Sequence, residues 1–263
     1  MNLLPSLFVP HGAPTFSLRP GAAGAALRRE ADSLPRPRAV IIASPHWDSA
    51  VPTVGSARQL ETIHDFWGFP DELYAIRYPA TGCPEAAAEV IAAISAAGLP
   101  VARDEQRGLD HGAWVPLRLM YPDADVPVVP ISVASRGGPQ LAWDIGRALA
   151  PLRERGFLIV GSGSITHNLR DFQQAWRNGG QTPDYIRVFA DWLNDRALAG
   201  DHAALLDYRR QAPHAAQAHP SEEHLLPFHF ALGAGGENAR AVRFHAGIDD
   251  YVIAMDGYRF LPQ

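Results

Sequence analysis

The chain of 263 residues contains no lysine, so all 23 of its basic residues are arginine. This absence excludes Schiff-base catalysis, a lysine general base and the lysine of a P-loop. The single cysteine, Cys83, excludes an internal disulfide and any zinc or redox site built from paired cysteines. Acidic residues number 28, which gives a net charge of -5. Because no positive surplus is present to neutralise phosphates, we expect no nucleic-acid partner.

Long apolar runs are also missing, since Pro, Gly or Arg interrupts each one well before the length of a membrane span. We therefore predict no membrane-spanning segment and no membrane partner. Residues 1–5 lack the charged and apolar regions of a signal peptide, so we expect a cytoplasmic protein. Hydrophobic residues make up 47% of the chain, which is ample for a buried core, and we expect residues 1–263 to form one domain. The sequence does not define an oligomeric state.

Short apolar runs alternate with segments of helical periodicity. Four runs without polar alternation are typical of strands buried on both faces: 7–9, 39–44, 126–133 and 157–160. Helical patterns cover 84–97, 141–152, 185–198 and 221–232. This order predicts an α/β fold with a central, mostly parallel or mixed sheet flanked by helices. Pro127 and Pro130 place the third strand at a sheet edge or make it irregular.

Histidine is plentiful, with 11 residues, and with lysine absent it must carry proton or metal chemistry together with the carboxylates. His11, His46 and His167 each follow an expected strand and lie close to Gly or Pro. Open α/β sheets bind ligands beyond the carboxyl ends of their strands, so these three imidazoles can converge. His224, in the last expected helix, could complete a facial set with His11 and His46. Imidazole binds Fe(II) and Zn(II), and a catalytic site needs about three protein ligands with open positions.

Structural interpretations stand beside these functional ones. Any single histidine near a strand end is commonly a hydrogen-bonded loop residue. Asp110-His111-Gly112 is typical of a turn, and residues 63–70 are typical of a loop packed by aromatics. Gly161-x-Gly163 lacks the third glycine of a dinucleotide loop and favours nucleotide binding only weakly. The remaining histidines without supporting context are expected to be surface or structural residues: His202, His214, His229 and His245.

Seven short motifs occur together in one order along the chain. They are His11-Gly12-x-Pro14, Ser44-x-His46-Trp47, Ile63-His64-Asp65-Phe66-x-Gly68-Phe69-Pro70, Asp110-His111-Gly112-x-Trp114, Met120-Tyr121-Pro122-Asp123-Ala124-Asp125, Gly163-Ser164-x-x-His167-Asn168-Leu169 and Glu223-His224-x-Leu226-Pro227. In this combination the sequence resembles the class III extradiol ring-cleavage dioxygenases of the 4,5-DOPA dioxygenase type, from near residue 7 to near residue 235. Two departures are Ala13, where serine is common, and Ser221-Glu222, where a second proline is usual. Neither removes a ligand atom, but both bear on substrate choice.

The resemblance implies a metal site and the residues that form it. His11 and His46 match the two early metal ligands of the family, and His224 matches the late one. His167 matches a histidine at the metal, for which we favour an acid/base role; a fourth-ligand role in a substrate-free zinc form stays open. The implied cofactor is Fe(II) for activity, with Zn(II) as an alternative bound metal on purification, because both accept imidazole.

The resemblance also implies the substrates and the residues around them. A small aromatic diol and O2 would react at the metal, and ring opening beside the diol would give a semialdehyde. His111 matches a catalytic histidine on the substrate side, while His64, Asp65 and Phe69 would help to line the pocket.

Two other functions use the same histidines. A zinc hydrolase could activate water with this ligand set, and it would hydrolyse an ester or amide instead of consuming oxygen. A non-catalytic metal-binding protein would keep its function when His167 is replaced.

Overall fold

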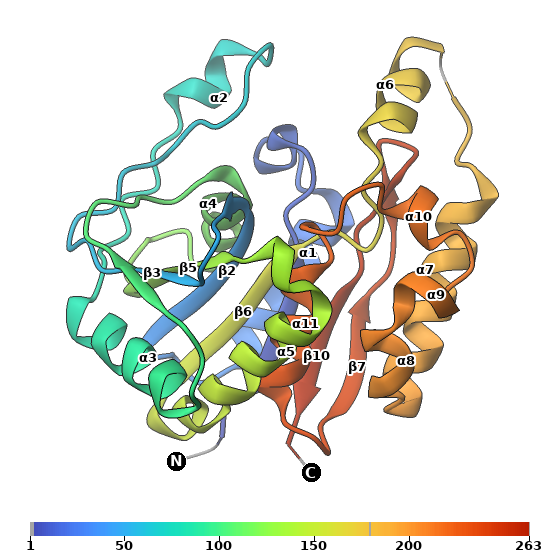
Figure 1. Cartoon of the computed structure of the whole chain (residues 1–263). Coiled ribbons are helices and arrows are strands. Elements are labelled where there is room, and N and C mark those ends of the chain that lie inside the picture. The colour runs from blue at the N-terminus through green and yellow to red at the C-terminus, as the bar shows by residue number, and fades with distance from the viewer. Residues whose placement is uncertain (1–2, 179, 263) are drawn as a thin grey trace.

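The computed structural model describes residues 3–178 and 180–262. Its centre is an eight-stranded mixed sheet with the strand order β4-β3-β5-β2-β6-β1-β10-β7 (Figure 1). These strands are β1 (Ser6–Pro10), β2 (Ala39–Asp48), β3 (Thr53–Gly55), β4 (Ala102–Asp104), β5 (Val128–Val133), β6 (Phe157–Gly163), β7 (Arg240–His245) and β10 (Gly257–Leu261). A separate two-stranded ribbon consists of β8 (Ile248–Asp249) and β9 (Ile253–Ala254).

The centre of the sheet is parallel. β5, β2, β6 and β1 pair in parallel, and they are the four apolar runs of the sequence. β10 and β7 extend the sheet with antiparallel pairings, and β3 pairs antiparallel with β5. The predicted α/β fold with a mixed central sheet is therefore confirmed.

Helices cover both faces of this sheet, as the unalternating apolar strands require. In β2, Val40 and Ile42 enter one core cluster, while Ile41 and Ala43 enter the other. Figure 1 shows α3, α5 and α11 on one face and α1 and α4 on the other. The helices are α1 (Gly21–Ser33), α2 (Asp71–Ala75), α3 (Pro84–Ala96), α4 (His111–Met120), α5 (Gly138–Leu149), α6 (Leu169–Asn178), α7 (Asp184–Ala199), α8 (His202–Leu206), α9 (Tyr208–Gln211), α10 (Ala215–Ala218) and α11 (Leu226–Gly235), with 3-10 turns η1 (Pro14–Ser17), η2 (Ser135–Gly137) and η3 (Ala150–Arg155). None of the helices in the described ranges is both long and apolar enough to cross a bilayer.

The expected edge position of the third strand is wrong, because β5 lies between β3 and β2. Val128 donates its N–H to the carbonyl of Thr81, away from β2. Pro130 lies two residues further along and faces the same side, so its missing N–H points toward β3 and not toward β2. The β3 pairing there consists of one position, Val54 with Ile131. A proline is thus tolerated inside the sheet because the short strand β3 forms few backbone hydrogen bonds with β5.

The last predicted helix also begins later than its pattern suggested. Residues 221–225 form bends and turns, and α11 starts at Leu226. Pro227 occupies the first helical turn, where its fixed φ and missing N–H are tolerated, and this fixes the start. His224 therefore lies in the loop before the helix, and its expected helical position is wrong.

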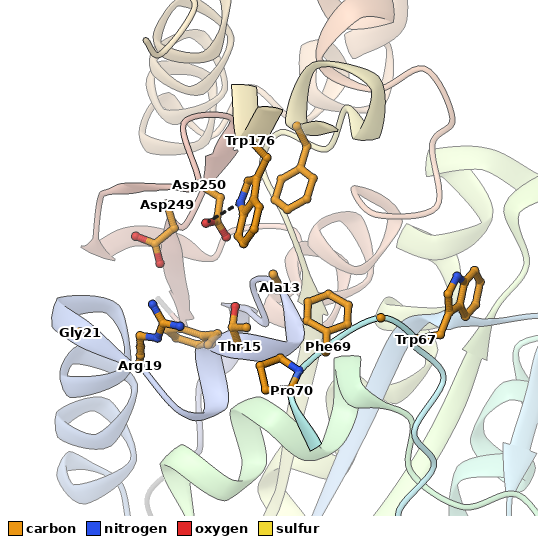
Figure 2. Close-up of a pocket in the computed structure, with 13 residues that line it drawn as sticks. Ala13, Thr15, Arg19, Gly21, Trp67, Phe69, Pro70, Trp176, Asp249 and Asp250 are labelled. Atoms are coloured by element: carbon orange, nitrogen blue, oxygen red, sulfur yellow. Dashed lines mark hydrogen bonds between the residues drawn. The ribbon is translucent and has the colours of Figure 1, made fainter. Parts of the chain in front are cut away.

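Two arms rise above the carboxyl ends of the parallel strands. One carries α2, the other carries α6, and Figure 1 shows them on opposite sides of the sheet's upper edge. Each arm bears an exposed tryptophan, Trp67 or Trp176 (Figure 2). The carboxyl ends of β1, β2 and β6 lie at this upper edge.

Candidate active site

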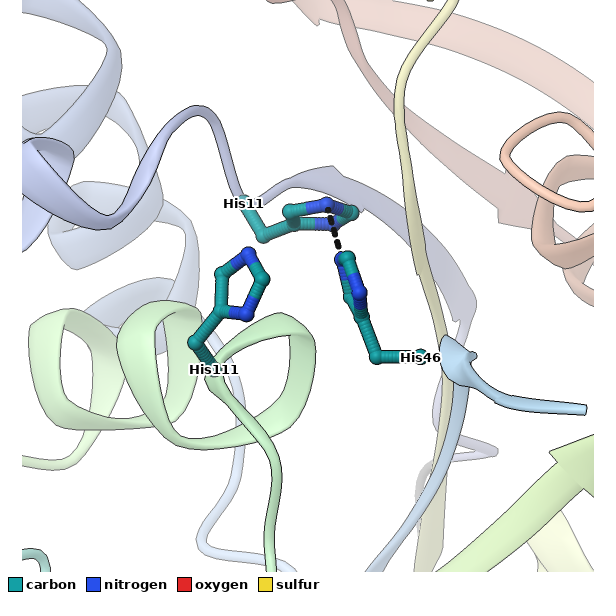
Figure 3. A group of neighbouring side chains, drawn as sticks. All are labelled: His11, His46 and His111. Carbon is teal, nitrogen blue, oxygen red and sulfur yellow. Dashed lines mark hydrogen bonds between the residues drawn. The ribbon is translucent and has the colours of Figure 1, made fainter. Parts of the chain in front are cut away.

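Imidazole rings from distant segments meet at this edge of the sheet. The ring centroids of His11 and His46 are 5.1 Å apart, and those of His46 and His111 are 3.9 Å apart (Figure 3). The ring of His224 lies 5.5 Å from that of His11 and 5.0 Å from that of His46. His167 stacks on His224 with a centroid separation of 3.4 Å. Five of the six site histidines selected from the sequence thus share one place, and His64 lies apart from them.

The ends of the secondary-structure elements set these positions. His11 directly follows β1. His46 lies inside β2, not after it as expected, in a stretch where pairing with β5 jumps from Ser44 to Asp48. This irregularity frees the strand end from the ladder and lets His46 turn toward the other rings. His111 is the first residue of α4. Asp110 caps the N-terminus of this helix, because its side chain accepts the Ala113 N–H at 3.2 Å.

Two glycines allow the backbone to approach the site closely. A Cβ on Gly112 would lie 2.4 Å from Ser44 Oγ and 2.8 Å from the His46 ring. A Cβ on Gly163 would lie 2.4 Å from the carbonyl oxygen of His224. Both motifs therefore carry glycine because a side chain would displace a site histidine.

The Nδ1 atom of His11 is anchored by a serine. Ser162 Oγ lies 3.2 Å from His11 Nδ1, and the Ser162 hydroxyl donates its one hydrogen to the carbonyl of Gly112. Ser162 can then only accept from His11, so Nδ1 carries the ring proton. In the neutral ring, Nε2 is left with a free lone pair.

Asp65 anchors two further rings through one oxygen. Its Oδ2 accepts from His111 Nδ1 at 2.9 Å and lies 3.3 Å from His46 Nδ1, while its Oδ1 accepts the His111 backbone N–H at 2.8 Å. Burial raises the pKa of Asp65, but the hydrogen bonds and charges of His111 and His46 outweigh it and lower the pKa to about 2. The ionised carboxylate only accepts, so both rings point Nε2 into the site.

His224 follows the same pattern. Its Nδ1 lies 3.2 Å from Glu223 Oε1, and its Nε2 is buried without a hydrogen-bond partner in the described structure. The Nε2 atoms of His11 and His46 face one another at 3.2 Å. Two lone pairs at this distance repel unless a cation lies between or beside them. The donor set therefore fits a metal ion that prefers nitrogen ligands.

The environment keeps the imidazoles neutral. Burial, followed by the charges of neighbouring imidazoles, holds the pKa of His11 and of His224 well below its usual value. Burial and then the charge of His111 lower the pKa of His46, and the same two causes lower that of His167 to about 4. Neutral rings are the metal-binding form, so the site is prepared for a metal near neutral pH.

A cavity of about 520 Å³, here called the inner cavity, opens from these rings. Asp65 and Phe69 line it, together with the apolar side chains of Phe66, Leu169, Phe172 and Ile253. His64 lies outside the lining, because its Nε2 donates to the Ile76 carbonyl at 3.1 Å and its ring contacts Tyr74 and Trp114.

Several residues that shape the site have no role that sequence patterns alone predict. Ser162 lies in the Gly161–Ser164 segment, where the glycines had suggested only a weak phosphate loop. Glu223 was part of a motif, but its contact with His224 follows from the loop fold. Phe66 was also part of a motif, whereas Phe172 carries no signal that separates it from core residues.

Comparison with known proteins agrees with this geometry. Residues 22–252 match the family model described as the catalytic LigB subunit of aromatic ring-opening dioxygenase. The chain belongs to this family. It is 37% identical to 4,5-DOPA dioxygenase extradiol of Beta vulgaris over 98% of this chain and 97% of that protein. It is 34% identical to the Escherichia coli K12 protein of the same name, over 88% of this chain and 85% of the relative.

A solved structure shares the fold over almost the whole chain. It is the crystal structure of an uncharacterized protein from Escherichia coli K12, which is 26% identical and superposes with a TM-score of 0.80. The alignment covers 97% of this chain and 99% of the other. The resemblance found in the motifs is confirmed, and the histidine site fits a metal-dependent extradiol dioxygenase.

Proposed function

We propose that this protein is an Fe(II)-dependent extradiol dioxygenase that opens the ring of a DOPA-like catechol with O2 to give a semialdehyde. One observation carries the proposal: the Nε2 atoms of His11 and His46 lie 3.2 Å apart, and the ring of His224, whose Nε2 has no partner in the described structure, lies 5.0 Å from that of His46. Family membership supports the reaction class, and the relatives named 4,5-DOPA dioxygenase support the substrate class.

His11, His46 and His224 would hold the metal. Each keeps its Nδ1 on an oxygen of a neighbouring side chain, which fixes the ring tautomer and its direction. One ring nitrogen of His111 also lies within 4.8 Å of one from His11 and one from His46. With Nδ1 held by Asp65, His111 has Nε2 available to bind a substrate hydroxyl.

Bound Fe(II) would supply the Lewis acidity that lowers the pKa of the catechol hydroxyls and the redox chemistry that O2 requires. The protein's own contribution is proton transfer and orientation. His167, with its pKa lowered to about 4, is neutral near pH 7 and can accept a hydroxyl proton at a ring nitrogen. A catecholate anion beside it would raise that pKa and stabilise the imidazolium until the proton is returned.

Apolar residues would orient the ring and keep water away. Phe66, Phe172 and Ile253 line the inner cavity together with the site histidines. A flat aromatic diol fits such a wall, because its ring faces are apolar and its hydroxyls lie along one edge. Asp65 and Phe69 would complete the substrate pocket, and His64 would support this wall from behind.

The experiment is an anaerobic titration of the metal-free protein with Fe(II), followed by a catechol panel that includes L-DOPA, and then admission of air. We expect oxygen uptake and a yellow ring-opened product from the iron-loaded protein, and neither from a zinc-loaded control. Absence of turnover across the panel in protein shown to contain iron would contradict the proposal. Ester or amide hydrolysis by the zinc form would point to a hydrolase instead.

A further inference from the structure

A second cavity lies beyond the inner one, here called the outer cavity. Its volume is about 660 Å³, and it shares Ala13, Trp67, Phe69 and Phe172 with the lining of the inner cavity (Figure 2). The two spaces therefore meet along a common wall. Because the inner cavity already has room for a catechol ring, the outer cavity is available to a substituent on that ring.

Opposite charges face this space. Asp249, the last residue of β8, and Asp250, which follows it, lie on one side, and Arg19, which precedes α1, lies on the other (Figure 2). Within the described ranges, Arg19 and Asp249 form no ion pair and no side-chain hydrogen bond with another residue. An acidic side and a basic side in one concave surface match a ligand that carries both charges.

The acidic side has a second feature suited to a cation. Trp176 Nε1 donates to Asp250 Oδ1 at 3.4 Å, which orients the carboxylate beside an indole ring that is 63% exposed. An aromatic face next to a carboxylate is the chemistry that binds an ammonium group. Burial, and then the charge of Asp250, raises the pKa of Asp249, and a cationic ligand would relieve this repulsion.

We propose that the outer cavity binds the amino-acid end of a catecholic amino acid, with Asp249 and Asp250 at the ammonium group and Arg19 at the carboxylate. These three residues then determine which catechols are bound well, and the histidines determine what happens to the ring. The proposal rests on the proposed function, since the ring is taken to lie in the inner cavity.

The test compares four catechols that differ only in their substituent. Dopamine carries the ammonium group, 3-(3,4-dihydroxyphenyl)propionate the carboxylate, L-DOPA both and 4-methylcatechol neither. The variants are the double replacement Asp249→Asn with Asp250→Asn, and the single replacement Arg19→Gln. Asp250 has a φ of 48°, a conformation that asparagine adopts readily, so the double variant keeps its backbone.

We expect the double variant to raise KM about tenfold for dopamine and L-DOPA and to leave KM for 4-methylcatechol and the propionate without a comparable rise. Arg19→Gln should raise KM about tenfold for L-DOPA and the propionate only. In each case kcat should change little, because the reacting ring is untouched. Matched controls are Glu154→Gln, which precedes β6 at the opposite edge of the sheet, and Arg29→Gln on the exposed side of α1. An equal change for all four catechols, or none, while 4-methylcatechol is still cleaved would overturn the inference and leave the proposed function standing.

Calorimetry on the metal-free protein gives a readout that does not depend on turnover. Tyramine and p-cresol are not catechols and differ in the ammonium group. We expect the double variant to weaken tyramine binding about tenfold and to leave p-cresol binding unchanged. If no catechol is cleaved, the proposed function fails, and the tyramine measurement alone tests the binding role of the outer cavity. Tyramine binding that weakens in the double variant supports that role. Tyramine binding that does not change in the double variant, or is absent, refutes it.

Discussion

Two groups of buried histidines show how one residue type serves two purposes in this molecule. His229, in α11, is fully buried, and both of its ring nitrogens lie within 3.1 Å of backbone carbonyls, those of Leu225 and Leu205. His11 and His224, at the sheet edge, are equally inaccessible, yet their Nε2 atoms face another nitrogen or no partner among the described residues. Burial alone therefore does not mark a functional histidine. The convergence of several free ring lone pairs at one place does, because buried acceptors without donors are costly together unless a cation completes them.

The largest effect should follow from removing one of the converging rings. For His46→Ala we expect the bound metal to be lost and oxygen uptake with a catechol to fall by at least about 10³-fold. Metal analysis and an oxygen electrode measure both quantities on the same sample. His202→Ala, which removes a histidine from α8, is the control and should retain metal and activity. Full metal content in His46→Ala would show that the sheet-edge histidines do not bind the metal, and would remove the difference in role between them and the interior histidines.

The next effect separates binding from proton transfer inside the site. We expect His167→Ala to lower kcat by about 10²-fold while the metal stays bound, since His167 serves as the proton acceptor in our account. Steady-state kinetics of the iron-loaded variant, with its metal content measured in parallel, test this. Loss of metal together with activity would instead make His167 a ligand.

A smaller effect is expected from the residue that orients two rings. Asp65→Asn keeps the shape of the side chain but offers one acceptor oxygen in place of a carboxylate shared by His46 and His111. We expect metal affinity or kcat/KM to fall about 10- to 100-fold. Competition with a metal chelator measures the affinity. An unchanged value would show that the rings keep their tautomers without this anchor.

The smallest effect concerns the interior histidines, His219 and His229, and appears only at acidic pH. Burial lowers the pKa of His229 to about 4 and that of His219 to about 3, below the value of about 6.5 for an unfolded chain. As the pH falls below 6.5, the unfolded chain takes up protons that the folded chain does not, so stability declines toward pH 4.

Urea unfolding of metal-free protein at pH 7.0 and pH 5.0 quantifies this decline. We expect each of these two histidines to contribute about 2 kcal/mol to the loss between the two values. In His229→Gln the loss should be smaller by that amount. An identical loss in the variant and the parent would show that His229 is protonated in the folded state.

The sequence predicted the parts of the fold that local pattern encodes. β1, β2, β5 and β6 are apolar runs long enough to be read, and the positions of His11 and His167 after β1 and β6 followed from them. β3 and β4 have three residues each, too few for a pattern, and β7 and β10 owe their pairing to contacts far along the chain. The place of β5 inside the sheet depended on which side the Pro130 nitrogen faces, and this is a property of the partner strand.

The site was predictable as a set of residues but not as a set of contacts. His11, His46, His111, His167 and His224 were found from their positions and motifs. That Asp65 serves two rings, or that Ser162 fixes the tautomer of His11, depends on segments 19 to 151 residues apart meeting in space. A local sequence pattern cannot predict such long-range contacts.

The most direct test is anomalous diffraction at the iron edge from crystals loaded with Fe(II) without oxygen. We expect one peak in contact with the Nε2 atoms of His11, His46 and His224, with the side toward the inner cavity open. A peak held by other residues, or the absence of any peak at this edge of the sheet, would contradict it.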